Sequence, residues 1–154
     1  MRYESMGDQR IPSFPVSVHL LLEQNGLILL SLRQNTGFAD GKFSLPAGKL
    51  ERGESVVSAM LREADEELGI QIKQGDLKTL HVMNRLGIDA NRIDYFFGCS
   101  RWEGSIVNRE PMKCGGLQWC APNDLPASLI PYVRHAITCI LKNEPFSLYG
   151  WLEK

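Results

Sequence analysis

Long apolar runs are absent from this sequence. No stretch reaches the length of about 18 apolar residues that a membrane-spanning helix needs. Residues 1–15 are polar and lack the apolar core of about 7–15 residues that a secretory signal peptide contains. We therefore expect a protein without a membrane-spanning segment, located in the cytoplasm. Met6 is as plausible a natural start as Met1, and the sequence leaves this open.

The sequence also has almost no excess of one charge. It carries 17 Lys and Arg residues against 18 Asp and Glu residues, which gives a net charge of −1, and it has no basic run. This composition does not favour stable binding to nucleic acid or to an anionic membrane through bulk positive charge. The expected partner is a small molecule.

Cysteine and histidine are scarce. The sequence holds 4 Cys and 3 His residues, and no two cysteines form a C-x-x-C pair. This spacing does not indicate a zinc site, and we expect reduced thiols and structural roles for His81 and His135. The four cysteines are Cys99, Cys114, Cys120 and Cys139.

The length bounds the organisation of the chain. A chain of 154 residues is long enough for one domain that buries about two thirds of its unfolded surface. We expect residues 1–15 to be a flexible N-terminal segment and residues 16–154 to be a single domain. The apolar residues 146–151 should pack on that domain or on a partner, and Trp102 and Trp119 should belong to the core.

The pattern of apolar residues predicts a mixture of strands and helices. Two apolar runs flank Asn25-Gly26, and Asn-Gly is the strongest short signal for a hairpin turn. A proline opens the last apolar periodic segment, as is typical of a helix start. Such a mixture predicts an α+β fold or an α/β/α sandwich. The expected strands are 16–22, 27–33, a short one at 43, 77–86, 92–102 and 117–121, and the expected helices are 55–68 and 131–143.

The segment 55–68 combines helix signals with a dense set of carboxylates. Ser55 is a good N-cap, and Gly69 follows the expected last turn. Glu63, Glu66 and Glu67 would then share one face at i, i+3 and i+4. The apolar residues of the opposite stripe would be buried, and the glutamates would point outward. That stripe consists of Val57, Leu61, Ala64 and Leu68.

These glutamates admit two interpretations. Clusters of this kind are usually solvated helix faces with ion pairs. Here, however, Arg62 is the only basic residue between Ser55 and Ile70, so most of the negative charge would be left unbalanced. A hard divalent cation such as Mg²⁺ takes carboxylate and phosphate oxygens as ligands, and a metal site is the better interpretation.

The residues from Gly48 to Ile70 also resemble a known family signature. Gly48, Glu54 after five residues, and the run that begins at Arg62 after seven more match the Nudix box G-x5-E-x7-R-E-U-x-E-E-x-G-U, where U is apolar. Every fixed position agrees. The resemblance implies a Nudix-type α/β/α sandwich with a mixed β-sheet. It also implies hydrolysis of a nucleoside diphosphate linked to another group, with Mg²⁺, or Mn²⁺ as a substitute.

The resemblance also implies roles for residues of the box. Glu63, Glu66 and Glu67, with the backbone carbonyl of Ala47, would hold the metal. The general base would be Glu63 or a residue outside the box. Gly48, Glu54 and Arg62 would support the loop structurally.

Residues outside the box are further candidates. Glu110, in a loop before a strand, would be an additional metal-binding or proton-accepting carboxylate. Arg33, at the end of the second strand, would contact phosphate. Arg85 and Asp94, on the second hairpin, would either meet substrate or face water.

The box does not identify the leaving group. A nucleoside triphosphate pyrophosphohydrolase is our first expectation, because the proline and tyrosine that mark relatives acting on ADP-ribose or dinucleoside polyphosphates are missing near residues 84–87. In similar proteins that clear oxidised purine nucleotides, Asn or paired Asp residues near the segment before the last helix read the base. This chain has Leu129-Ile130-Pro131-Tyr132 there, which weakens an 8-oxo-purine specificity. Nucleotide sugars and dinucleotides remain alternatives.

Two alternatives from other classes also fit this box: a non-catalytic nucleotide-sensing module, and an isomerase or RNA-processing member of the wider superfamily. A non-catalytic nucleotide-sensing module would be expected to lose a ligand glutamate, and this chain keeps all of them. An isomerase would need Cys99 or Cys114 beside the metal, and an RNA-processing enzyme would need a basic groove. The chain is expected to be a monomer or a homodimer.

Overall fold

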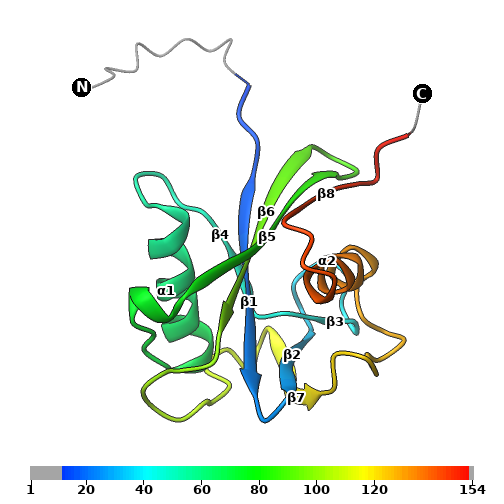
Figure 1. Ribbon diagram of the computed structural model, residues 1–154. Coiled ribbons are helices and arrows are strands. Elements are labelled where there is room, and N and C mark those ends of the chain that lie inside the picture. The colour runs from blue at the N-terminus through cyan, green and yellow to red at the C-terminus, as the bar shows by residue number, and fades with distance from the viewer. Residues whose placement is uncertain (1–11, 153–154) are drawn as a thin grey trace.

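The computed structural model describes residues 12–152, so residues 1–11 of the expected N-terminal segment lie outside the described residues. Two α-helices cover opposite faces of a mixed β-sheet, α1 on one side and α2 on the other (Figure 1). The α/β/α sandwich is therefore confirmed. The elements are β1 (Val16–Gln24), β2 (Leu27–Arg33), β3 (Phe43–Ser44), β4 (Ala47–Lys49), α1 (Val56–Leu68), a 3₁₀ turn η1 (Gln74–Asp76), β5 (Lys78–Leu86), β6 (Asn91–Cys99), β7 (Cys114–Cys120), α2 (Pro131–Leu141) and β8 (Phe146–Tyr149).

Strand β1 is the centre of the sheet. The strand order is β3-β2-β1-β6-β5-β8, with β4 paired to β1 and β7 paired to β2. The β1–β6 and β5–β8 pairs are parallel, and the others are antiparallel. β1 thus contacts β2, β4 and β6, and it joins the box to the rest of the domain.

The two local signals that predicted β1–β2 and α1 act as expected. Asn25 and Gly26 both have positive φ, 53° and 77°, as a tight two-residue hairpin turn requires. Ser55 caps α1 by accepting a hydrogen bond of 3.0 Å from the amide of Ser58. Gly69 ends the helix in the left-handed region at φ 68°, where a residue without Cβ is favoured.

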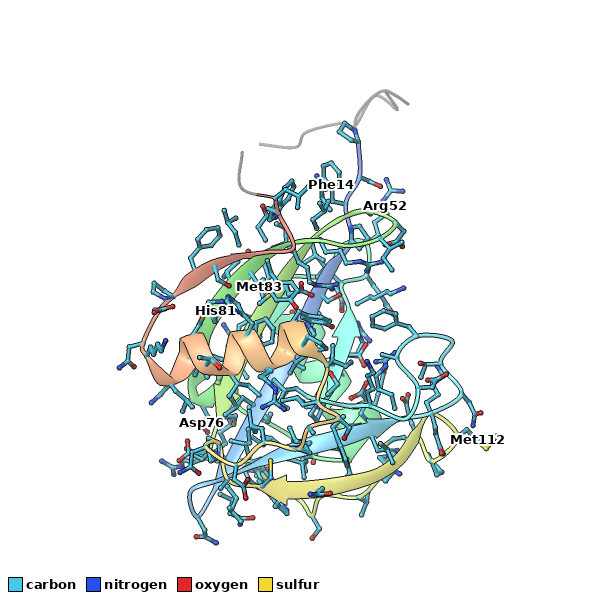
Figure 2. The ribbon with its side chains drawn as sticks, turned by 90° about the vertical axis from the view of Figure 1, so that its right-hand side faces the viewer. Phe14, Arg52, Asp76, His81, Met83 and Met112 are labelled. Carbon is cyan, nitrogen blue, oxygen red and sulfur yellow. The ribbon has the colours of Figure 1, made fainter. Side chains whose placement is uncertain are left out.

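The core is divided by the sheet into two parts. On the α1 side, Ala59, Met60 and Leu68 pack against β1 and β6. On the α2 side, Val133 and Ala136 pack against the opposite face of the same strands, with the other apolar side chains of that face. Figure 2, viewed toward α2, shows His81 and Met83 on β5 beside this helix. The expected placement of Trp102 and Trp119 is also observed, because both are half-buried against the α1-side core.

Four strands differ from expectation. β6 ends at Cys99 and not at 102. β4 was not predicted, because it has only three residues and contains Gly48. β7 begins at Cys114 and not at 117, because Cys114 and Gly116 pair with β2 on either side of a bulge, although glycine is a poor strand former. The apolar C-terminal segment packs on the domain as β8, parallel to β5.

His81 holds β8 in place. Its Nδ1 lies 2.7 Å from the carbonyl of Glu144, and its Nε2 lies 2.7 Å from Oγ of Ser147. The ring is fully buried. A structural role, as expected from the sequence, agrees with these contacts.

An ionic cluster is buried on the α2 side of the sheet. The Asp94 side chain is 0% exposed and accepts hydrogen bonds from Nε2 of His19 at 3.1 Å and from Nε and Nη2 of Arg85 at 2.8 and 3.2 Å. Burial by itself raises the pKa of a carboxyl, but these hydrogen bonds and charges hold the pKa of Asp94 below its ordinary value. The expectation that Asp94 meets substrate or faces water is wrong, because the sheet and its two partners enclose it.

None of the helices in residues 12–152 is both long enough and apolar enough to cross a membrane.

The variant Asp94→Asn should be destabilised by about 3 kcal/mol at pH 7, because it leaves the buried guanidinium of Arg85 without a full counter-charge. Since the pKa of Asp94 is lowered in the native state, its contribution is present above the ordinary carboxyl pKa and is lost as the pH falls through the native value. The gap between wild type and variant should therefore shrink below about pH 4, as measured by urea unfolding midpoints.

The control is Asp89→Asn on the same hairpin. Asp89 also pairs with an arginine, Arg92, at 2.9 Å, but its side chain is exposed. This variant should have the same urea unfolding midpoint as the wild type, both at pH 7 and below about pH 4. An equal loss in the two variants would contradict the role given to the buried pair.

Candidate active site

The backbone of β4 lies against the carboxylate-bearing face of α1. A Cβ atom at Gly48 would stand 2.0 Å from Cδ of Glu63, closer than any real contact. Glycine is therefore required at this position for Glu63 to reach the strand. This close approach fixes the distance between the helix and the loop that precedes it.

Arg62 ties the loop 49–54 to α1. Its guanidinium donates to both oxygens of Glu54, from Nη2 at 2.6 Å and from Nε at 3.1 Å, and also to the carbonyl of Lys49. Nη1 donates to Glu63 at 2.7 Å and to Glu66 at 3.3 Å. The hydrogen bonds from Arg62 and from the amide of Glu51 lower the pKa of Glu54. The pair has the geometry of a structural brace.

Glu67 faces the start of β4. One of its oxygens accepts a hydrogen bond of 3.2 Å from the amide of Ala47. Burial, followed by the charges of Glu63 and Glu110, raises the pKa of Glu67 well above its ordinary value. The pKa of Glu63 is also raised, mainly by burial, in spite of its contact with Arg62. Negative charge is thus concentrated at a place where little solvent screens it.

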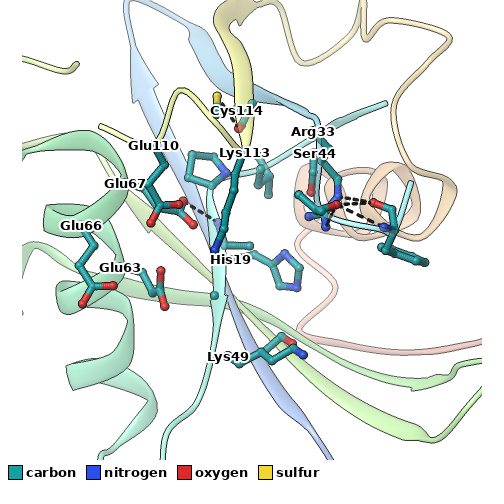
Figure 3. Close-up of a pocket in the computed structure, with 18 of the residues that line it drawn as sticks. His19, Arg33, Ser44, Lys49, Glu63, Glu66, Glu67, Glu110, Lys113 and Cys114 are labelled. Atoms are coloured by element: carbon teal, nitrogen blue, oxygen red, sulfur yellow. Dashed lines mark hydrogen bonds between the residues drawn. The ribbon is translucent and has the colours of Figure 1, made fainter. Parts of the chain in front are cut away.

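Glu110 joins these glutamates from a distant loop. The amides of Val107 and Arg109 donate to the carbonyls of Leu68 and Glu67, which docks the loop on the last turn of α1. Figure 3 shows the Glu110 carboxylate beside that of Glu67. No hydrogen bond or ion pair to the Glu110 carboxylate is present within residues 12–152. Four carboxylates therefore gather at one place: the three that the helix spacing placed on one face, and Glu110, which the family resemblance added to them.

The helix orientation differs from expectation. The glutamates do not simply point outward: the side chain of Glu66 is 51% exposed, but that of Glu63 is only 13% exposed. Val57 and Leu61 are half-buried, whereas Met60 is fully buried. The helix is rotated about its axis because β4 covers the glutamate face, and the buried residues of α1 are Ala59, Met60, Ala64 and Leu68.

The four glutamates, Arg62 and the β4 backbone line one cavity of about 1130 Å³. The four glutamates lie at its acidic end, and Arg33, Ser44 and the buried His19 lie toward the other end (Figure 3). The second end, on the α2 side of the sheet, is lined by Arg85, Tyr132, Arg92 and others. The cavity thus connects a carboxylate cluster with an arginine-rich and aromatic region.

The two arginines expected to bind substrate both reach the cavity, but they are already held by protein groups. Nε and Nη2 of Arg33 donate to the carbonyl of Phe38 at 2.8 Å and to Oγ1 of Thr36 at 3.0 Å. Arg85 is held by Asp94, and its guanidinium carbon lies 3.8 Å from the centre of the Tyr132 ring. The pairing orients each guanidinium and leaves part of it available.

Several cavity residues were not found by sequence reasoning. Lys49, Lys113, His19, Ser44 and Tyr132 line the cavity. Lys49 could have been found because it directly follows Gly48. The others carry no local signal, because only the pairing of distant strands brings them together.

The cysteines separate into two classes. Cys99 is buried, donates to the carbonyl of Arg101 and does not line the cavity. Cys114 does line it, but its sulfur is engaged by Oγ of Ser31 at 3.2 Å and by the carbonyl of Gly116. All four cysteines are free.

The donor chemistry of the acidic end fits a hard divalent cation. Glu63, Glu66, Glu67 and Glu110 offer carboxylate oxygens, which Mg²⁺ and Mn²⁺ prefer. As the side chains stand, no three Asp, Glu, His or Cys residues within 12–152 form a ready group for a metal ion. Arg62 holds Glu63 and Glu66 in ion pairs, so binding requires these two side chains to turn.

Comparison with known proteins gives one family. The model of the NUDIX domain matches residues 13–138. The 8-oxo-dGTP diphosphatase of Escherichia coli is 26% identical over 120 residues, which cover 77% of this chain and 92% of that protein. The crystal structure of a MutT NUDIX hydrolase from Burkholderia pseudomallei has a TM-score of 0.75 and 27% identity, covering 82% of this chain and 98% of that chain.

A further relative is longer. The low-salt glycan biosynthesis protein Agl8 of Haloferax volcanii is 33% identical over 89 residues, which cover 58% of this chain. The match covers only 49% of the length of Agl8. The chain thus spans about half of this relative.

The variant Gly48→Ala should displace Glu63, because the new Cβ would occupy the place of its carboxylate. Since Glu63 is a flexible side chain, we expect a loss of only about 1 kcal/mol in stability but at least a tenfold loss in Mn²⁺ affinity by calorimetry. Gly75→Ala is the matched control, because a Cβ there meets nothing within 4 Å. Unchanged Mn²⁺ affinity in Gly48→Ala would contradict the placement of Glu63 at the metal.

Proposed function

The chain belongs to the NUDIX family, and from this premise we propose that it is a divalent-metal-dependent pyrophosphohydrolase of nucleoside triphosphates. Water attacks a phosphorus of the triphosphate, and the products are a nucleoside monophosphate and pyrophosphate. The observation that carries the proposal is the convergence of Glu63, Glu66, Glu67 and Glu110 at one end of a nucleotide-sized cavity. Such a substrate would place the activity in the cytoplasm.

The charge distribution supports this chemistry. Cleavage of a phosphoanhydride needs little covalent help but much neutralisation of charge, because the phosphates repel the attacking nucleophile. When bound, Mg²⁺ or Mn²⁺ supplies that neutralisation and lowers the pKa of water. Glu63, Glu66 and Glu67 would hold the cation, together with the carbonyl of Ala47.

The proton acceptor is best assigned outside the box. Nη1 of Arg62 donates to Glu63 at 2.7 Å, so an oxygen of Glu63 is already occupied by a protein donor. The carboxylate of Glu110 has no such partner within residues 12–152 and lies beside Glu67 (Figure 3). Glu110 would accept the proton of the attacking water, because its oxygens are the ones left without a donor.

The remaining groups position the substrate. Arg33 stands at the end of β2 with its guanidinium oriented by the loop 36–38. It would bind the phosphate oxygens that leave as pyrophosphate. Glu54 and Arg62 act through the loop that they hold and not on the substrate.

The nucleotide specificity of this proposal is supported by a relative. The 8-oxo-dGTP diphosphatase of Escherichia coli matches this chain over 92% of its own length. Its name points to a nucleoside triphosphate as substrate. The test is a panel of nucleoside triphosphates, oxidised nucleotides, nucleotide sugars, ADP-ribose and dinucleoside polyphosphates, with and without Mg²⁺. Mg²⁺-dependent pyrophosphate release from a triphosphate is the expected result. Turnover of another compound class in the panel would assign that class as the substrate in place of nucleoside triphosphates. If no compound in the panel were hydrolysed, a nucleotide-sensing module would be favoured.

The variant Glu67→Gln should lower the turnover of the best substrate by at least a hundredfold, because it removes one anionic ligand. Without metal it should be as stable as the wild type or slightly more stable, since burial and neighbouring charges disfavour the ionised carboxyl. Mg²⁺ should raise the melting temperature of the wild type and much less that of the variant.

The control for Glu67→Gln is Asp65→Asn. Asp65 lies on the same helix but pairs with Arg109 and Gln71 and does not line the cavity. Its replacement should leave both turnover and the Mg²⁺ shift unchanged. Wild-type activity in Glu67→Gln would rule out the assigned metal site.

The variant Glu110→Gln should lower kcat by about a hundredfold or more with little change in melting temperature, because general-base catalysis contributes on this scale. Glu103→Gln serves as control, since Glu103 lies in a nearby loop with its side chain 70% exposed. Steady-state kinetics with both variants check the assignment. If Glu110→Gln kept the kcat of the control, Glu110 would be a solvated loop residue.

A further inference from the structure

The second end of the cavity contains an arginine held in an unusually fixed position. Arg85, on β5, is 9% exposed and lines the cavity on the α2 side of the sheet. Its Nε and Nη2 donate hydrogen bonds to the Asp94 carboxylate, and its guanidinium carbon lies 3.8 Å from the centre of the Tyr132 ring. His19 in turn donates to Asp94 from Nε2. Three strands and α2 therefore fix the plane and the direction of one guanidinium.

Part of this guanidinium has no partner in the part of the chain that the structure describes. An arginine carries five N–H donors, and Asp94 takes two of them, one from Nε and one from Nη2. The outer edge formed by Nη1 and Nη2 keeps two parallel donors. Among the described residues, Nδ1 of His19 is the only side-chain nitrogen or oxygen that is both buried and without a partner. Nη1 of Arg85 has no partner within residues 12–152 and is not one of the buried atoms, so it is accessible from the cavity that Arg85 lines.

The charge of Arg85 is already balanced. Asp94 is ionised and bound to it, because hydrogen bonds from His19 and Arg85 outweigh the effect of burial on its pKa. The pair thus offers two directed donors with almost no net charge. A neutral group with two adjacent acceptors matches this edge better than a second anion, which would find no unbalanced positive charge.

We propose that the outer edge of Arg85 recognises a 6-oxopurine through its O6 and N7 atoms. This deepens the proposed function and rests on it, because it names the base carried by the triphosphate. O6 and N7 of guanine are the two adjacent acceptors that an arginine binds bidentately. Adenine replaces O6 by an amino donor, and 8-oxoguanine carries a hydrogen on N7, so each opposes one of the two donors.

His19 and Asp94 are positioning residues in this arrangement. They do not touch the base, but they fix Arg85 and leave its outer edge as the available one. Tyr132 holds the guanidinium over its ring through a cation–π contact of 3.8 Å. The selectivity would therefore arise from one rigid side chain.

The test uses nucleoside monophosphates, which contain no anhydride bond and so separate binding from hydrolysis. The probes are GMP, IMP, AMP and 7-deaza-GMP, titrated into the full chain by calorimetry with Mg²⁺ present. GMP and IMP should bind about tenfold more tightly than AMP and 7-deaza-GMP, because each of the latter loses one charge-assisted hydrogen bond. Equal binding of all four, or no binding of any, would overturn the proposal.

The variant Arg85→Lys makes the test specific to this residue. Lysine keeps the charge but not the two parallel donors, so the four probes should differ by less than about threefold. Arg92→Lys is the matched control, since Arg92 lines the same cavity but pairs with the exposed Asp89. It should keep the tenfold preference. A preference that persists in Arg85→Lys would assign the recognition to another group.

The outcome can be separated from that of the proposed function. If the wild type hydrolyses triphosphates but binds the four monophosphates equally, the hydrolase proposal stands and the role of Arg85 falls. If it prefers GMP and IMP but releases no pyrophosphate from any triphosphate, the base recognition stands and the hydrolase proposal falls.

Discussion

The contact between Arg62 and its surrounding carboxylates is the interaction on which the site depends. One guanidinium binds Glu54, Glu63 and Glu66 and the carbonyl of Lys49. It therefore sets the path of the loop that leads into α1 and the positions of two candidate ligands. Because Gly48 lets the backbone approach Glu63 closely, the loop can lie on the helix without separating the carboxylates from the cavity.

The same arrangement divides the cavity into two chemical environments. At one end, negative charge exceeds positive charge, and the pKa values of Glu63 and Glu67 are raised first by burial and further by the neighbouring carboxylates. At the other end, the pair of Arg85 and Asp94 is balanced and buried. A substrate with an anionic part and a neutral part fits both ends, since a cation satisfies the first and directed hydrogen bonds satisfy the second.

The elements that were predictable are those with strong local signals. Asn25-Gly26 specifies its hairpin, and Ser55 and Gly69 specify the ends of α1. β4 could not be predicted, because its three residues form a strand only by pairing with β1. β7 was predicted to begin too late, because its glycines join the ladder only through β2. The rotation of α1 about its axis was not predicted either, because the packing of β4 against α1 decides which side of the helix is covered.

The sequence by itself determined the carboxylate-bearing helix, the loop that precedes it and the family to which both belong, because these depend on residues close together in the chain. The tertiary structure alone decided that Glu110 lies beside Glu67, and that His19, Asp94 and Arg85 form one buried cluster. These contacts join residues on different strands and loops. The pairing of β1 with β6 and of β5 with β6 brings His19, Asp94 and Arg85 together. The hydrogen bonds that dock the loop before β7 on the last turn of α1 bring Glu110 to Glu67, and local propensity cannot encode such contacts.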